Sequence, residues 1–136
     1  SRTVDSESLY CAISESEIQK AILQIHGNRA SGPDGIGANM YKCTSAAIIP
    51  YLVRLFNEIF DTGIIPDNWG ESIIVPIHKK GSKQTPTNYR GISLINSLCK
   101  IFTCVRNNRL FQWCEEHNIL DESQAGFRKK LITYSL

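Results

Sequence analysis

The chain has 136 residues, of which 42% are hydrophobic, and a formal net charge of +2. This is the size of one domain or of a piece of a larger one, and the apolar content excludes a disordered tail. No apolar run approaches the ~18 residues of a membrane helix, so we expect no membrane contact. The polar start, S-R-T-V-D-S-E-S, has neither the apolar core of a signal peptide nor an initiator methionine, which indicates a segment from inside a longer product.

The five cysteines are odd in number, and none belongs to a C-x-x-C pair. The three histidines are scattered, so the spacing favours neither a zinc site nor a disulfide framework. We therefore expect buried or partly buried free thiols in a reducing compartment. The expected location is intracellular, in the cytoplasm and nucleus.

The first half of the chain is predicted to be helical. Ser14 and Glu17 form a capping-box pattern, followed by one apolar stripe on a helix over residues 15–26. The glycines and proline of residues 30–35 predict a tight loop. By itself, such a loop is most often an ordinary surface turn.

Two further helices are predicted before the middle of the chain. Residues 38–47 form a short helix, and residues 51–62 form an amphipathic one. Pro50 is placed in the first turn of the second helix, because proline is tolerated there but not in a helix interior. Gly63 is predicted to end that helix.

Two β-prone segments, residues 73–77 and 91–95, flank a loop rich in cations and predict a hairpin. Asn96 or Ser97 is predicted to cap a longer helix that runs to about Glu116. The overall prediction is an α+β fold.

Charge is unevenly divided along the chain. Residues 1–72 carry five basic and nine acidic side chains, whereas residues 73–136 carry ten basic and four acidic ones. This asymmetry indicates a polyanionic partner for the second half, although a solvated basic surface is the plainer explanation.

The predicted hairpin concentrates cations that suit a nucleoside triphosphate: Lys79, Lys80, Lys83 and Arg90. Arginine can engage two phosphate oxygens with its fork, and lysine supplies a more mobile point charge. The alternative is a charged edge that protects a hairpin from aggregation.

Five sequence elements in order resemble the reverse transcriptases of non-LTR, LINE-like retrotransposons of the jockey type. Residues 29–36 (R-A-S-G-P-D-G-I) resemble the family's K/R-x-x-G-x-D-G-I element, and residues 69–81 resemble its W-x-x-A/S-x-I-V-P-I-x-K-K-G motif. Residues 86–94 resemble P-x-N-Y-R-P/G-I-S-L, residues 100–101 the K-I/V that follows, and residues 124–128 Q-x-G-F-R. The elements together are far more specific than any one of them.

The resemblance implies roles for particular residues. Arg90 resembles the arginine that holds the phosphates of the incoming nucleotide, and Lys79 or Lys80 resembles the lysine that reaches the terminal phosphate. The implied contacts with template and nucleotide are Asp34, Gly35, Gln124, Gly126 and Arg128. Trp69 and Tyr89 are interpreted as packing residues.

The carboxylates that a polymerase needs for two catalytic metal ions have no counterpart in the chain. None of its five aspartates matches the family's metal-binding positions, and Glu115 and Glu116 are adjacent on a predicted helix, so they face different ways. We predict no catalytic residue and no metal ligand here, so that Mg²⁺ would act only in the full-length parent enzyme. The chain alone is expected to be inactive.

The resulting hypothesis is the fingers and the start of the palm of a right-hand polymerase, with helices packed around a basic β-hairpin and the catalytic palm sheet missing. Residues 1–13 are a polar N-terminal segment, residues 14–128 a partial reverse transcriptase domain, and residues 129–136 an atypical tail. The implied partners are an RNA template, a DNA primer, deoxynucleoside triphosphates and the palm and thumb of the parent.

Two alternatives remain open: a non-catalytic RNA-binding or interaction module derived from a retroelement, and a decayed, inert reading frame. We also expect the helices at 15–26, 51–62 and 97–114 to expose apolar faces that would otherwise pack on a palm sheet, so that the product tends to aggregate.

Overall fold

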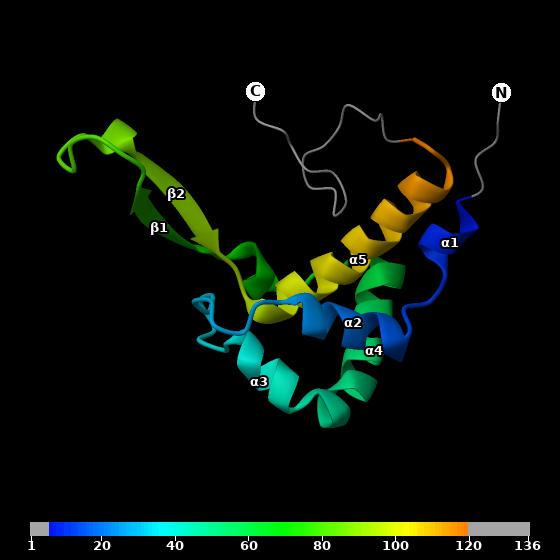
Figure 1. The fold of residues 1–136 in the computed structure, drawn as a ribbon. Helices are drawn as coiled ribbons and strands as arrows, with labels where there is room; N and C mark the ends of the chain where they lie inside the picture. Colours follow the sequence, from blue (N-terminus) through cyan, green and yellow to red (C-terminus); the bar gives the residue numbers. More distant parts are fainter. Residues whose placement is uncertain (1–5, 120–136) are drawn as a thin grey trace. The chain divides into compact units, whose positions relative to one another are not determined.

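The structure, a computed structural model, describes residues 6–119. Residues 12–105 form one compact unit, and residues 6–11 with 106–119 belong to a second. The fold is α+β, as predicted, with a single antiparallel pair of strands in the described residues. The elements, drawn in Figure 1, are the helices α1 (Glu7–Tyr10), α2 (Glu15–Gln24), α3 (Ala38–Cys43), α4 (Ser45–Thr62) and α5 (Ser97–Glu116), the strands β1 (Ile73–His78) and β2 (Tyr89–Leu94), and two short 3₁₀ turns, Asp67–Gly70 and Pro86–Asn88.

The start of α2 confirms the predicted capping box. The Ser14 hydroxyl accepts a hydrogen bond from the Glu17 amide, and the Glu17 carboxylate accepts one from the Ser14 amide at 2.9 Å. The helix ends at Gln24, two residues earlier than predicted, because Ile25 is extended (φ −74°, ψ 133°). The chain therefore turns toward the glycine-rich loop before Gly27 is reached.

Helix α4 begins at Ser45, six residues before the predicted start, so Pro50 lies inside the helix. The prediction was wrong because a proline near a helix start removes only one hydrogen bond, the one that Ala46 would accept. Ala46 and Pro50 are both exposed, so water can reach that carbonyl. Because α4 takes residues 45–47, α3 is shorter than predicted. Gly63 ends α4 as expected, with φ +70° and its amide 2.8 Å from the Ile59 carbonyl oxygen.

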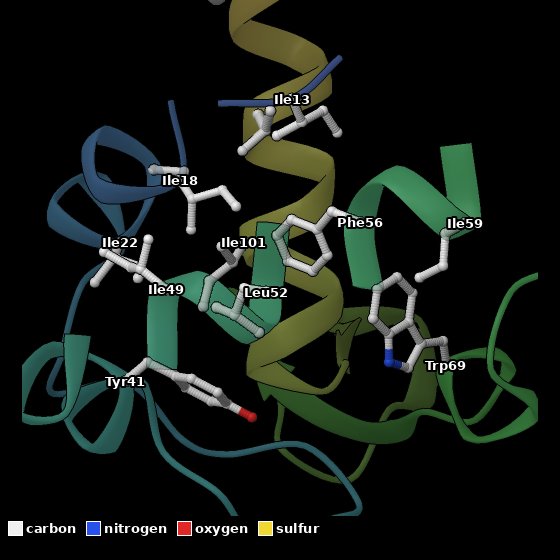
Figure 2. Packing of buried hydrophobic residues seen from close by; sticks show 12 residues of the cluster. Ile13, Ile18, Ile22, Tyr41, Ile49, Leu52, Phe56, Ile59, Trp69 and Ile101 are labelled. Carbon is white, nitrogen blue, oxygen red and sulfur yellow. The ribbon is translucent and has the colours of Figure 1, made fainter. Parts of the chain in front are cut away.

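The core of the larger unit lies between α2, α4 and the first turns of α5 (Figure 2). Its centre holds Ile18, Phe56 and Ile101, none of which is exposed. Trp69 packs beside Phe56 and Phe102, with ring centroids 6.4 and 5.6 Å away, which confirms that it is a packing residue. Helices α2 and α4 and the first turns of α5 thus bury apolar residues against one another, so the expectation of exposed apolar faces was wrong for these parts. It is not overturned for the second half of α5, where Leu110 is 52% exposed.

The β1–β2 hairpin, called the ribbon below, gathers several exposed apolar side chains in one element. In Figure 1 it extends away from α2, α3 and α4. It bears exposed aliphatic side chains on both faces, with Ile74 at 69% exposure; the set is Ile73, Ile74, Val75, Ile77 and Ile92. The ribbon is therefore a surface that is expected to favour association between copies of the chain.

In the smaller unit, α1 lies beside the second half of α5. The Arg109 guanidinium donates to the Cys11 carbonyl oxygen at 2.6 Å. After α5 ends at Glu116 as predicted, Asn118 adopts a left-handed conformation (φ 51°), and the Ile119 amide donates to the Cys114 carbonyl oxygen. This is a common way for a helix to end, and asparagine tolerates it.

Two further observations concern membrane spans and the cysteines. Among residues 6–119, no helix is both long and apolar enough to cross a membrane. All five cysteines are free thiols; Cys99, Cys104 and Cys114 are partly buried, whereas Cys11 and Cys43 are exposed, contrary to prediction.

Candidate nucleotide and nucleic-acid site

The ribbon is a regular antiparallel ladder. Its register pairs Ile73 with Leu94 at one end and His78 with Tyr89 at the other. The Lys79 amide donates to the Asn88 carbonyl oxygen at 2.8 Å, which extends the ladder by one pair. Because the direction of the N–H groups alternates along a strand, Lys79, Ile77 and Val75 point theirs toward the partner strand. An N–H at Pro76 would point away from it, so the proline costs the ladder no hydrogen bond.

The loop between the strands, residues 79–88, is held by side chains at its base. The Asn88 amide donates to the Ser82 carbonyl oxygen at 2.9 Å, and the Tyr89 hydroxyl donates to that of Lys83 at 2.8 Å. The His78 and Tyr89 rings lie edge to face with centroids 5.2 Å apart. A side chain at Gly81 would meet the Asn88 amide, and its φ of +84° requires glycine. The loop is therefore a defined structure that carries its lysines outward.

Four cations lie exposed at this end of the ribbon: Lys79, Lys80, Lys83 and Arg90. Strand alternation places Arg90, opposite Ile77, on the face of Val75 and Ile92. The guanidinium is therefore on an open, largely apolar surface and is not directed into the core. Because the 79/88 pair continues the ladder, Lys79 shares the face of Arg90.

A second part of the candidate site is the loop at residues 30–36, which lies against the base of the ribbon. A β-carbon on Gly32 would sit 2.4 Å from the Ile95 carbonyl carbon and 2.5 Å from the Asn96 nitrogen. Glycine is required here because the two backbones touch. This explains in physical terms why a glycine stands at this point of the G-x-D-G element.

Asn96 joins three segments of the larger unit and is only 2% exposed. Its Oδ1 accepts a hydrogen bond from the Asp34 amide, and its Nδ2 donates to the Asn68 carbonyl oxygen, both at 3.1 Å. The next residue, Ser97, donates its hydroxyl to the Ile36 carbonyl oxygen at 2.9 Å. From the sequence, Asn96 was considered only as a helix cap. Its position directly after the apolar residues Leu94 and Ile95 was the available sign that its side chain would be buried and would need hydrogen-bond partners.

Asp34 and Gly35 are both exposed at the turn of this loop. The Asp34 carboxylate accepts the Ile36 amide at 3.0 Å, and Gly35 has φ +71°. These contacts give Asp34 a structural role within its own loop. Burial, with a further contribution from the Asp34 charge, raises the pKa of the Tyr41 hydroxyl above its usual value, so this residue remains neutral in the core.

The remaining predicted residues, Gln124, Gly126 and Arg128, lie outside the described residues. Within residues 6–119, no group of three histidine, cysteine, aspartate or glutamate side chains could hold a metal ion. The described part of the chain does not fit a catalytic Mg²⁺ pair, and no chemical step can be derived from it.

An α+β unit with an exposed cationic ribbon is compatible with a piece of a polymerase, and comparisons with known proteins agree. The chain is 33% identical over 114 residues to the probable RNA-directed DNA polymerase from transposon BS of Drosophila melanogaster. It is 34% identical over 113 residues to that from transposon X-element, and 30% identical over 120 residues to that from mobile element jockey, both of the same fly. No protein-family model matches the chain.

These matches cover 82–86% of the chain but only 12–13% of each relative. The chain is a homologue of one segment of jockey-type and other non-LTR RNA-directed DNA polymerases, which confirms the resemblance seen in the sequence. It spans about one eighth of the length of the curated relatives it matches.

Proposed function

We propose that this chain is the fingers and the start of the palm of a retrotransposon RNA-directed DNA polymerase. In this role it binds the incoming deoxynucleoside triphosphate and the RNA template, while other parts of the parent protein supply the metal ions, the primer site and the chemistry. Its setting would be the cytoplasm and nucleus. The observation that carries the proposal is the exposed cationic end of a paired ribbon in a homologue of these enzymes.

Arg90 and Lys79 are proposed to bind the same triphosphate. They share one face of the ribbon, and the open surface lets a polyphosphate reach both. This register favours Lys79 over Lys80, a choice that the doubled lysine leaves open in the sequence. Charge-assisted hydrogen bonds of this kind are worth about 1.5–3 kcal/mol each.

Asp34, Gly35, Gln124, Gly126 and Arg128 are proposed to lie along the template and nucleotide. For Asp34 and Gly35 the support is their exposure on a loop that is fixed to the base of the ribbon. A backbone contact suits them better than a side-chain one, because the Asp34 carboxylate would repel phosphate and already accepts the Ile36 amide.

The test is a titration of the full 136-residue chain with a fluorescent dATP analogue at low salt. We expect Arg90→Ala and Lys79→Ala to weaken binding by roughly 10- to 100-fold each, the range that corresponds to about 1.5–3 kcal/mol. Lys83→Ala is the matched control, because Lys83 is an exposed cation of the same loop. It should change the affinity by less than about 2-fold.

Equal losses in Arg90→Ala and Lys83→Ala would contradict the assignment of roles. A wild-type chain that binds no triphosphate but retains RNA would favour a non-catalytic RNA-binding module derived from such an element.

A further inference from the structure

A hollow of about 240 Å³ lies where the end of α2 and the following loop meet the first turn of α5. Its lining includes His26 and Arg29 on one side and Ser97 and Lys100 on the other. We call this the basic hollow. It is smaller than the sites of about 300–1,000 Å³ that take drug-sized ligands, so it suits a single small group.

The basic hollow has an uncompensated positive charge. Of the residues that the structure describes, no aspartate or glutamate lines it. Among residues 6–119, neither the Arg29 guanidinium nor the Lys100 ammonium has an ion-pair partner. Asp34 belongs to the same loop, but its carboxylate accepts the Ile36 amide and does not line the hollow. Two cations that line one hollow without a carboxylate among the lining residues favour an anionic occupant.

The basic hollow cannot share a triphosphate with Arg90 and Lys79. It lies beyond the base of the ribbon, whereas those two cations lie at the other end. The five steps from Tyr89 to Leu94 separate the two ends of β2 by roughly 17 Å, at about 3.4 Å per step, and Arg90 lies one step inside the far end. Its occupant is therefore a different phosphate, and a polynucleotide carries one phosphate per nucleotide along its whole backbone.

The two sides of the hollow are also held together. Gly32 lies against the backbone of Ile95 and Asn96, and the Asn96 side chain binds the Asp34 amide. The loop that carries Arg29 is thereby fixed to the start of the helix that carries Lys100. Less conformational entropy is then lost when both side chains close on one phosphate.

We propose that Arg29 and Lys100 bind a backbone phosphate of the single-stranded RNA template in the basic hollow. This rests on the proposed function and adds a strand contact separate from the triphosphate site. Arginine supplies a fork for two phosphate oxygens, and lysine a second charge from the opposite side.

The test is fluorescence anisotropy of a labelled oligouridylate of about 16 nucleotides, the upper site size of a small single-strand-binding fold. Arg29→Ala and Lys100→Gln in the full chain should each weaken RNA binding roughly tenfold. The slope of log Kd against log salt, between about 50 and 200 mM, should fall by about 0.7 for each lost contact. Affinity for the dATP analogue should remain unchanged.

Two matched controls are Lys20→Ala and Arg54→Ala, exposed cations on α2 and α4 of the same unit. They should change RNA affinity by less than about 2-fold. Lys100→Arg should retain most of the binding, which separates a charge contact from a folding defect, and circular dichroism should show wild-type helicity in every variant.

RNA binding at wild-type strength in the Arg29→Ala, Lys100→Gln double variant would overturn the inference and leave the proposed function standing. An equal loss of dATP-analogue binding would overturn it as well, since the hollow would then serve the triphosphate. Another outcome is that inorganic phosphate competes with RNA more strongly than chloride does at equal ionic strength, and only in chains with an intact hollow. That result would overturn the inference and identify a free-phosphate site. A wild-type chain that binds neither RNA nor triphosphate would overturn both proposals.

Discussion

Replacement of Asn96 by alanine tests whether one side chain holds three segments together. Its two hydrogen bonds, to the Asp34 amide and the Asn68 carbonyl oxygen, are both 3.1 Å long and partly buried. The variant leaves the Asp34 amide and the Asn68 carbonyl oxygen without a partner, and each buried group left so costs about 1–3 kcal/mol. Because both groups are affected, we expect the free energy of unfolding to fall by roughly 2–4 kcal/mol. For a domain with about 5–15 kcal/mol in total, this is a large fraction.

The assay is urea unfolding followed by circular dichroism at low protein concentration. With a slope of about 1–3 kcal/mol per molar, the midpoint should fall by on the order of 1–2 M. Asn107→Ala is the matched control: Asn107 is exposed on the same helix, so its loss should be neutral or stabilise by about 0.5 kcal/mol. Hydrogen exchange gives a local readout, because the Asp34 amide loses its acceptor. Equal midpoints for the two variants, with unchanged protection of that amide, would refute the reasoning.

Three further outcomes are expected. Gly32→Ala should destabilise the chain by about 1–3 kcal/mol in the same urea assay, because its β-carbon would overlap the Ile95 backbone; Gly70→Ala, which has open space around it, should not, and equal midpoints would contradict the close approach. The wild-type chain should associate in sedimentation velocity, and Ile74→Thr with Ile77→Thr should shift it toward monomer more than Leu23→Thr does, whereas a monomeric wild type would rule out the exposed ribbon as a cause. Iodoacetamide at pH 8 should modify the exposed Cys11 and Cys43 well before Cys99, whose pKa is raised by burial and lowered only in part by Lys100; mass spectrometry that finds Cys99 modified first would show that this burial is absent.

Local patterns predicted most of the elements correctly. The capping box at Ser14, the end of α4 at Gly63 and the hairpin of residues 73–94 each depend on nearby residues, and each is found in the structure. The error in the predicted start of α4 has a local cause too. The prediction treated Pro50 as incompatible with a helix interior and did not consider that its exposed position lets water satisfy the carbonyl left without a donor.

What the sequence did not predict depends on contacts between distant segments. Asn96 contacts residues 62 and 28 positions away, and no periodicity reports such a contact. The basic hollow joins Arg29 to Lys100 in the same way. Helices α2 and α4 and the first turns of α5 also bury apolar residues against one another, a mutual arrangement that patterns within single helices do not reveal.

The ribbon is fixed at both ends by side-chain hydrogen bonds, at its base through Asn96 and at its loop through Asn88. Midway between them, Pro76 faces Gly91, a pair with one missing N–H and one missing side chain. The ladder nevertheless continues through this pair without losing a hydrogen bond. A β-carbon at Gly91 would lie 3.3 Å from the Ile74 Cγ2 atom, so a larger residue at the centre of the ribbon would press on an exposed isoleucine and not on a cation.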